Sequence, residues 1–549
     1  MSGNMSSLRE YEPGELERLK DAYLKNPARN KDITLYDQTW NDMNMDRVFA
    51  RIDSCRSFAG EERLYAILRE PFCDAGEIKR RDSLIRHFDE NNAISEGYSK
   101  KLSDIGREIK KPVNIAINEL EGLKMQGSLI HILCALLGLF AIAMIFVSPT
   151  AGLLVFLVTL IINIPLYFKR KGEIGDYISC FSVIIRAYHA ANAMLAVSDD
   201  EELDYRTSMR NAVQNLKPVV RGSFIVTSGR GLTGGAINMV MDYLRIFFHV
   251  DLIKFNSMQK KVLAHKDDII LMFKALGEID AFIAIAEYRR SLPYWCVPEY
   301  AEDVAYGGEN RDEKARYIGA DMHPAMTAQE LGHPLLQKPV TNDINIGNKG
   351  VLITGSNASG KSTFLRSVGL AAILGQSIAT VYARSYKASK FHIISAMSVM
   401  DDIVSGSSYY MAEIKAVKHV LEACEKSGNA GEAPVLCFVD EVLKGTNTIE
   451  RIAASSEILK SLAGNNVISF AATHDIELTE MLEGYYDNYH FSEEVFEDNI
   501  SFSYKLLKGA ATTRNAIKLL KIMGYDDAIT ESAEHNAESF EKTGAWQRL

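Results

Sequence analysis

The octapeptide GSNASGKS at residues 355–362 decides the fold of the second half of the chain. It fits the pattern G-x-x-x-x-G-K-[ST], it follows the apolar run at 351–354, and it opens the segment 363–376, whose apolar residues recur at helical spacing. A strand, a glycine-containing loop and a helix in this order form a phosphate cradle, because the loop N–H groups and the positive end of the helix dipole face the same point. The sequence therefore predicts a nucleoside triphosphate site in an α/β domain of the P-loop class. The alternative, a chance match in a loop, is disfavoured by the two flanking elements.

Individual residues of this loop have candidate roles. Lys361 would place its ammonium group near the β and γ phosphates, and the hydroxyl group of Ser362 would bind Mg²⁺. The residues expected to contact the nucleotide are Gly355, Ser356, Asn357, Ala358, Ser359, Gly360, Lys361, Ser362 and Thr363.

Two further apolar segments end in polar side chains. Residues 435–441 form an apolar run that ends in Asp440 and Glu441, and residues 467–474 form another that ends in His474. An all-apolar strand suits a parallel sheet that is covered on both faces, and ligands bind at the carboxyl ends of such strands. We therefore expect Asp440 to bind Mg²⁺, Glu441 to orient or deprotonate the attacking water, and His474 to sense the γ-phosphate. The alternatives are a surface acidic turn and a histidine that is only a satisfied polar residue.

The composition is that of an ordinary globular protein. The chain has 549 residues, 47% of them hydrophobic and 24% charged, which suits two to four domains and a sizeable core. The formal net charge of −10 excludes a surface that is positive all over, so a nucleic-acid contact would need a local basic patch. Seven scattered cysteines without a C-x-x-C pair indicate reduced thiols, and the polar N-terminal segment contains no secretory signal. We therefore expect the nucleotide-binding domain to be intracellular.

Two uncharged apolar runs stand next to each other in the first half of the chain. Residues 128–147 and 151–168 are each close to the length that crosses a hydrocarbon core of about 30 Å, and only a short turn separates them. Basic residues flank the pair on both sides, within 110–124 and at 169–171. This pattern predicts a transmembrane hairpin whose two ends lie on the cytoplasmic side, together with the nucleotide-binding domain. The alternative is a helical hairpin buried in a soluble core.

The remaining segments have amphipathic helical patterns that are typical of an all-α domain. We expect an N-terminal helical extension at 1–45, a first helical core part at 46–125, the transmembrane hairpin at 126–171, a second helical lever part at 172–299, and the ATPase domain at 300–549. Glycine-containing breaks at 228–235 and 307–313 are interpreted as turns or loops.

Four segments, in this order, resemble a known family. GSNASGKSTFLRSVGLAAILGQ at 355–376, DDIVSGSSYYMAEI at 401–414, FVDEVLKGTNTIE at 438–450 and AATHDIELTEM at 471–481 are similar to the ATPase domain of the MutS family of DNA mismatch repair proteins. Weaker similarity extends to 46–60 and 277–281, which resemble the start of the family's helical core and the end of its lever helices.

The resemblance implies an ABC-type ATPase, with a mixed sheet flanked by helices, that binds ATP and Mg²⁺ and works as a homodimer with ATP held between two nucleotide domains. It implies that Ser408 reaches the γ-phosphate of the ATP bound by the partner subunit, that Gln376 lies near Mg²⁺ and the attacking water, and that Asn357 lies beside the phosphates. Residues 445–448 would form a loop that crosses the dimer interface. The expected catalytic set is then Glu441, His474, Lys361 and Gln376.

The sequence also departs from the family pattern. No counterpart of the family's mismatch-reading domain, with its Phe-x-Glu wedge, is found before Asp46, and no nuclease domain is found after the helical segment at 515–523. The apolar hairpin stands where the family has a DNA-gripping clamp, and Val340 stands where an aromatic residue would stack on adenine. We therefore expect a membrane-associated variant with neither direct mismatch reading nor an intrinsic nuclease.

Three functions remain open from the sequence. The first is a MutS-like ATPase, anchored in the cytoplasmic membrane, that couples ATP hydrolysis to movement of its helices and acts on mismatched or branched DNA. The second is a soluble cytoplasmic binder of such DNA in which the apolar runs are core helices. The third is an ABC-type motor for transport or secretion that acts on a membrane protein partner without DNA.

Overall fold

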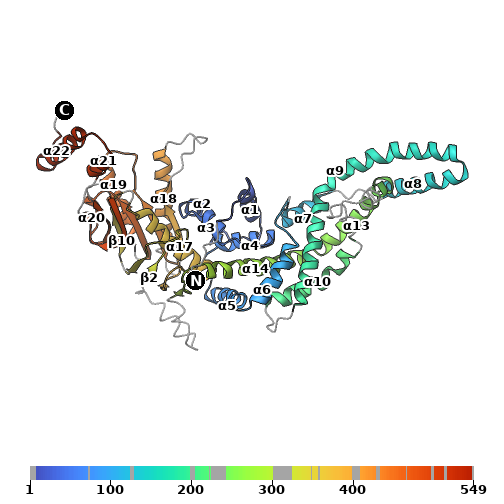
Figure 1. Ribbon diagram of the computed structural model, residues 1–549, viewed down its shortest axis with the longest axis horizontal. Helices are drawn as coiled ribbons and strands as arrows, with labels where there is room; N and C mark the ends of the chain where they lie inside the picture. The colour runs from blue at the N-terminus through green and yellow to red at the C-terminus, as the bar shows by residue number, and fades with distance from the viewer. Residues whose placement is uncertain are drawn as a thin grey trace.

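The computed structural model describes residues 8–546 apart from 72–73, 110, 124–128, 198–203, 222, 224–242, 301–323, 348, 357–358, 399–408, 428–432, 465, 496–499 and 512–515. The molecule is elongated, with the β-sheets at one end, most of the helices in the middle and a helical hairpin at the other end (Figure 1). The expected breaks at 228–235 and 307–313 lie outside the described residues.

Six strands form the sheet that positions the candidate site, in the order β10-β9-β4-β8-β7-β6. Strands β9, β4, β8, β7 and β6 run parallel to one another, and β10 pairs antiparallel with β9. The sheet is therefore mixed, as predicted. The strands are β4 Gly350–Thr354, β6 His392–Ala396, β7 Val435–Asp440, β8 Val467–Thr473, β9 Tyr486–Val495 and β10 Ile500–Lys508.

Helices cover both faces of the central strands. Helix α17 (Lys361–Ile378) shares one hydrophobic core with Val351 and Ile353 of β4, whereas helices α18 (Tyr409–Ser427) and α19 (Thr448–Leu462) share a second core with Leu352. Successive residues of a strand point to opposite faces, so a strand between two helical layers must be apolar throughout. Every residue of β4 and of β8 is accordingly buried.

A smaller sheet packs beside the first, in the order β1-β5-β2-β3. Its strands are β1 Glu299–Tyr300, β2 Met326–Leu331, β3 Asn342–Ile346 and β5 Ser385–Ala388. Three further helices complete this end of the molecule: α20 Glu477–Met481, α21 Ala516–Ile522 and α22 Asp527–Thr543.

The first half of the chain is helical, as predicted. Its helices, apart from the hairpin, are α1 Glu15–Leu24, α2 Asp37–Asp42, α3 Met45–Ile52, α4 Phe58–Arg69, α5 Ala75–Glu90, α6 Asn92–Ser103, α7 Val113–Gly122, α10 Asp204–Val220, α13 Val250–Ala264 and α14 Lys266–Ser291. Helix α14 is the central member and packs against α4, α5 and α10. It runs along the length of the molecule from the middle helices to the sheet end (Figure 1).

Helices α4 and α14 pack closely at a point where one buried carboxylate lies between them. Asp280 of α14 is 1% exposed and accepts hydrogen bonds from the N–H of Arg56, the N–H of Ser57 and the hydroxyl of Ser57, at 2.6–3.1 Å. The carboxylate therefore caps the N-terminus of α4 from another helix. Gly60 leaves the space, since a Cβ there would lie 2.3 Å from Oδ2 of Asp280.

The helical half also holds the far end of the phosphate-loop helix. Arg289 of α14 donates to the carbonyl of Ala379 and to the hydroxyl of Thr380, both at 2.8 Å, and Arg81 of α5 donates to the carbonyl of Ser377 at 2.6 Å. These carbonyls stand at the C-terminus of α17, where a positive charge is stabilised by the helix dipole. Helix α17 is thus bound at its C-terminus by the helices of the first half.

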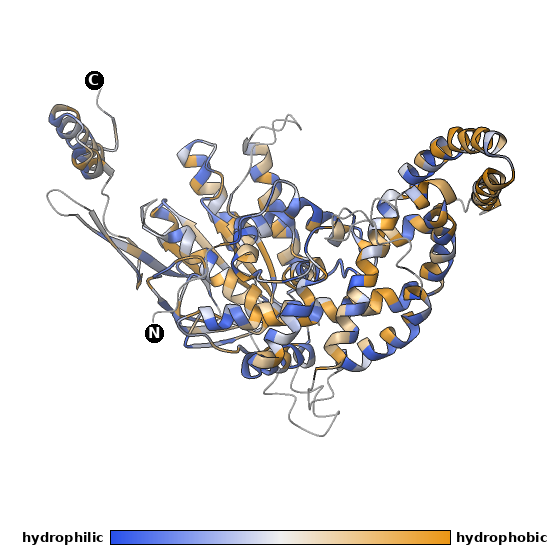
Figure 2. Cartoon of the chain, turned by 45° about the vertical axis from the view of Figure 1, so that its right-hand side comes forward, coloured by the Kyte–Doolittle hydropathy of each residue, from blue (hydrophilic) through white to orange (hydrophobic). Residues whose placement is uncertain are grey.

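The two apolar runs form helices α8 (Leu129–Val147) and α9 (Pro149–Leu195), joined by a tight turn at Ser148. Both are long and apolar enough to cross a membrane, by length and composition, and 22% of each apolar window is buried within the chain. Leu154 is 66% exposed and Phe146 86% exposed, so the hairpin is not enclosed in a core of this chain. Figure 2 shows it as an almost continuously hydrophobic projection. The second helix does not end at residue 171 but continues into the body of the molecule.

The α4–α14 crossing makes a stability prediction. Gly60→Ala should lower the free energy of unfolding by about 2–4 kcal/mol, because its new methyl group would overlap the Asp280 carboxylate and disrupt the hydrogen bonds to it. Gly97→Ala in α6 is the matched control, since nothing lies within 4 Å of its Cβ. It should stabilise by up to about 1 kcal/mol through helix propensity. Urea unfolding measures the stability of both variants. Equal unfolding midpoints would contradict the close packing of Gly60 against Asp280.

Candidate active site

Three neighbouring parallel strands end at the same edge of the larger sheet. The phosphate loop follows β4, Asp440 is the last residue of β7, and His474 follows β8 directly. Because β4 pairs with β8 and β8 with β7, these three strand ends are adjacent. The sheet topology therefore gathers residues that are more than a hundred positions apart in the chain.

The phosphate loop encloses the ammonium group of Lys361. Its Nζ donates to the carbonyl oxygens of Gly355 at 2.6 Å and Ser356 at 2.9 Å, and it lies 3.2 Å from Nε2 of His474. Burial lowers the pKa of Lys361 to about 8, although Glu441 and Asp440 nearby favour its charged form. A phosphate group bound at this place would favour the charged ammonium and raise that pKa again.

Two glycines shape the loop backbone. Gly355 has a φ of +142° and Gly360 a φ of +106°, a region that residues with a side chain rarely adopt. A Cβ at Gly355 would also lie 2.8 Å from Oγ of Ser359. Both positions of the loop therefore favour glycine.

Ser362 and Asp440 bring a hydroxyl oxygen and a carboxylate together. The Ser362 hydroxyl donates to Oδ2 of Asp440, and Oδ1 of Asp440 is buried with no hydrogen-bond partner in the described part of the chain. Burial raises the pKa of Asp440. A hydroxyl and a carboxylate suit Mg²⁺, which takes oxygen ligands, and a cation would satisfy the orphaned oxygen and favour the ionised carboxylate. The residues present therefore fit this ion.

Glu441 is held between the side chains of His474 and Lys444. Its Oε1 lies 2.7 Å from Nε2 of His474, and its Oε2 lies 2.7 Å from Nζ of Lys444. Burial alone would raise the pKa of Glu441, but the hydrogen bonds from His474 and Lys444 outweigh burial and lower the pKa to about 2. The carboxylate is therefore ionised at neutral pH and can accept a proton or a hydrogen bond from water.

The backbone around Glu441 is strained. Glu441 has a φ of +53° and Leu443 a φ of +60°, the left-handed region that costs a residue with a side chain about 1–2 kcal/mol. Hydrogen bonds hold this turn in place: the Glu441 N–H donates to the carbonyl of Ala472 at 2.9 Å. With this backbone conformation at the end of β7, the Glu441 side chain contacts His474 and Lys444.

Two residues of the site were missed by the sequence analysis. Lys444 contacts Glu441, and the ring of Tyr504 lies beside the loop, 3.1 Å from where a Cβ of Gly360 would stand. Tyr504 is 43% exposed and has a φ of +52°. Its aromatic face could stack on a nucleobase. Lys444 stands three residues after Glu441, and this spacing could have indicated an ion pair between them. No local signal in the sequence connects Tyr504 to Gly360.

Gln376 does not belong to the site, and the expectation that it lies beside Mg²⁺ and the attacking water is wrong. It lies fifteen residues after Lys361 in α17, which is about 22 Å along the helix axis. Its side chain is buried and forms a pair of hydrogen bonds with the backbone of Phe391, at 2.9 and 3.0 Å. The amide therefore fixes the backbone at Phe391, directly before β6.

The other predicted residues divide into two groups. Ser359 is buried and donates to the carbonyl of Ser356, and Thr363 lies half-buried in the first turn of α17. Asn357, Ala358 and Ser408 lie outside the described residues.

Comparisons with known proteins agree with this geometry. Residues 351–541 match the family model of MutS domain V. The chain is 24% identical to the DNA mismatch repair protein MutS from each of two strains of Thermus thermophilus, over 95% of the chain and 62–63% of the relative. It is also 24% identical to the DNA mismatch repair protein MutS of Thermus caldophilus, over 95% of the chain and 63% of that protein.

The chain thus spans slightly less than two thirds of the length of these relatives. The similarity runs through both the helical half and the sheet end, and the family model covers the candidate site from the phosphate-loop strand onward. The chain is thus similar to MutS proteins along most of its length, and residues 351–541 match MutS domain V.

Proposed function

We propose that this protein is an Mg²⁺-dependent ATPase of the ABC type that works as a dimer and moves its helical half when ATP binds and is hydrolysed. The observation that supports this most directly is the grouping of Lys361, the Ser362–Asp440 pair, and the Glu441–His474 pair at one edge of the sheet. These are the positions at which a phosphate, a cation and an attacking water are handled in phosphoryl transfer.

The residues divide the work as follows. Lys361 binds the β and γ phosphates, and a bound phosphate takes the place of the carbonyl oxygens that its ammonium group now contacts. Glu441 accepts the proton of the attacking water or fixes its orientation, and Lys444 holds that carboxylate in place. His474 lies between Lys361 and Glu441, where it can donate to the γ-phosphate. Ser362 and Asp440 hold Mg²⁺, which neutralises negative charge on the phosphates.

Tyr504 takes the place of the missing aromatic residue before Asn342. Its ring stacks on the adenine in this proposal, because it borders the loop at Gly360 and nearly half of its surface is free. The amide of Asn342 fixes strand β10, which bears Tyr504. It donates to the carbonyl of Tyr504 and accepts from the N–H of Leu506.

The second half of the ATP site comes from a partner subunit. The similarity to the MutS family supports an ATP sandwich, in which Ser408 reaches the γ-phosphate across a homodimer interface. The partial exposure of the His474 and Lys444 side chains, 38% and 43%, leaves room for such a contact. Closure of the dimer would cover both.

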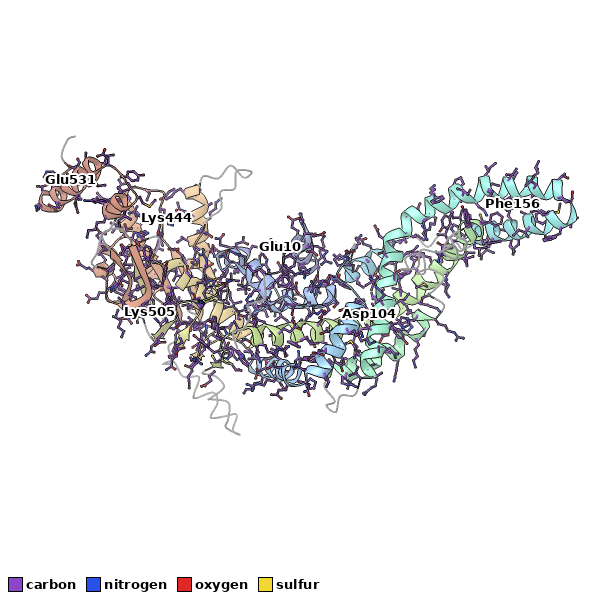
Figure 3. The ribbon with its side chains drawn as sticks, in the orientation of Figure 1. Glu10, Asp104, Phe156, Lys444, Lys505 and Glu531 are labelled. Carbon is purple, nitrogen blue, oxygen red and sulfur yellow. The ribbon has the colours of Figure 1, made fainter. Side chains whose placement is uncertain are left out.

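Movement at the site reaches the helical half through α17. The helix starts at Lys361 and is bound at its other end by Arg81 and Arg289. The hairpin lies at the opposite end of the molecule, as the positions of Lys444 and Phe156 show (Figure 3). A shift of α17 therefore acts on α14 and through it on the helices that bear the hairpin.

The hairpin anchors the protein in the cytoplasmic membrane in this proposal, with the ATPase end in the cytoplasm. Its uncovered apolar surface and its basic flanks support this location. Soluble MutS-like binding is the alternative, and the exposed face of α8 and α9 argues against it because water would contact large apolar side chains.

We propose that the ATP-driven movement acts on mismatched or branched DNA, on the basis of the family resemblance alone. A second candidate is an ABC-type motor that moves a membrane protein partner, which the uncovered hairpin favours. Salt-dependent binding of a mismatched or branched duplex to the purified full chain separates the two. The absence of binding at low salt would favour the motor.

A Glu441→Gln enzyme should bind ATP with unchanged affinity but hydrolyse it at least about 100-fold more slowly, because the amide cannot accept the proton of water. With Mg²⁺ and ATP it should accumulate as a closed dimer, which light scattering after gel filtration detects. Lys361→Ala is the control that should lose ATP binding and stay undimerised. Normal turnover by Glu441→Gln would remove this residue from the catalytic role.

The membrane location of the hairpin can be tested with the substitutions Leu139→Lys and Ile161→Lys at its exposed apolar centre. Leu139 and Ile161 are 56% and 73% exposed, so neither substitution disturbs a core. If these residues face lipid, each lysine costs about 2.5–3.5 kcal/mol, and the double variant should leave the membrane fraction. Gln214→Lys on the exposed surface of α10 is the matched control. Wild-type protein that alkaline carbonate releases from membranes would contradict the anchor.

A further inference from the structure

A small cavity lies next to Asp440, between helix α18 and the turn that follows β7. Glu413 of α18 lines it together with Asp440, Val442 and Lys444. Its volume of about 10 Å³ is close to that of a single water position. The cavity therefore adjoins Asp440, the carboxylate of the proposed ion-binding pair.

Glu413 is buried at this cavity with half of its carboxylate unused. The residue is 6% exposed, and its Oε1 accepts a hydrogen bond from the N–H of Lys444 at 3.1 Å. Its Oε2 is buried with no hydrogen-bond partner among the described residues, as is Oδ1 of Asp440. Two residues that line the same small space thus each have one carboxylate oxygen without a hydrogen-bond donor among the described residues.

Such an arrangement is costly unless a positive group or a donor completes it. A buried oxygen that has lost its water costs about 1–3 kcal/mol, and more when it is charged. Mg²⁺ usually binds to one or two carboxylates and keeps several of its own water molecules, each of which donates two hydrogen bonds. A hydrated cation on Asp440 would supply the donor that Oε2 of Glu413 lacks.

We propose that Glu413 is a positioning residue for the Mg²⁺ ion, accepting a hydrogen bond through Oε2 from a water molecule of the hydration shell. This inference rests on the proposed ATPase function and adds a residue to the same site. Glu413 also fixes the N–H of Lys444, whose ammonium group contacts Glu441. One side chain of α18 therefore holds both the ion and the turn that bears the catalytic base.

Binding of Mn²⁺ to the full chain in the presence of ATP tests the proposal, with free Mn²⁺ measured by electron paramagnetic resonance. E413Q keeps an oxygen for the Lys444 N–H but presents an NH₂ group to the cavity, so it should bind Mn²⁺ about 10–100-fold more weakly. Glu425→Gln, on the exposed face of the same helix, is the matched control and should bind Mn²⁺ as the wild type does. ATP affinity in the presence of a chelator should be the same in all three proteins.

The outcomes separate this inference from the proposed function. If the wild type binds no Mn²⁺ with ATP, the proposed function itself fails. If it binds Mn²⁺ and E413Q binds it equally well, only the role of Glu413 is overturned. Glu413→Asp, which keeps the charge, should lose less Mn²⁺ affinity than E413Q. Equal losses in these two variants, or loss of metal-free ATP binding in E413Q, would show that Glu413 has only a structural role.

Discussion

Helix α17 is held at both ends by groups that belong to different halves of the protein, and the proposed coupling depends on this constraint. At its N-terminus the phosphate loop turns around Lys361, and at its C-terminus Arg289 and Arg81 bind the last carbonyl groups. Hydrogen bonds from charged donors contribute about 1.5–3 kcal/mol each, so the helix cannot shift without moving its partners. Arg289 is 1% exposed and also pairs with Asp82 at 2.8 Å, which fixes the guanidinium on the helical side.

The chemistry at the other end of α17 is organised by charge. Lys361, His474, Glu441 and Lys444 form a continuous series of contacts, in which the Glu441 carboxylate lies between His474 and Lys444. Glu441 and Lys444 stand on the turn after β7, whose backbone is left-handed at Glu441 and Leu443. The contacts of Glu441 with His474 and Lys444 offset this strain, and in the proposed function a bound triphosphate would change them by drawing Lys361 or His474 away.

The sequence predicted those parts of the site that depend on local signals. The phosphate loop, Asp440, Glu441 and His474 each follow a recognisable apolar strand, and parallel pairing brings strand ends together. Tyr504 could not be found this way, because its place beside Gly360 depends on how β10 pairs across a register shift with β9. The prediction for Gln376 was wrong because it relied on the family resemblance and ignored the length of the helix between Lys361 and Gln376. In the helical half, spacing indicated most helices, but not that α9 would continue past the charged residues 169–171 or that Asp280 would cap α4.

The coupling is tested most directly by a distance between the two halves of the molecule. Fluorescent dyes in place of Lys349, beside β4, and Gln214, on the exposed surface of α10, report this distance by single-molecule energy transfer. The account predicts that Mg²⁺ and ATP shift the distance in the intact chain, and that the shift disappears when Arg81 and Arg289 are both replaced by alanine while ATP binding is kept. An unchanged distance on ATP binding, or an equal shift without the two arginines, would contradict transmission through α17.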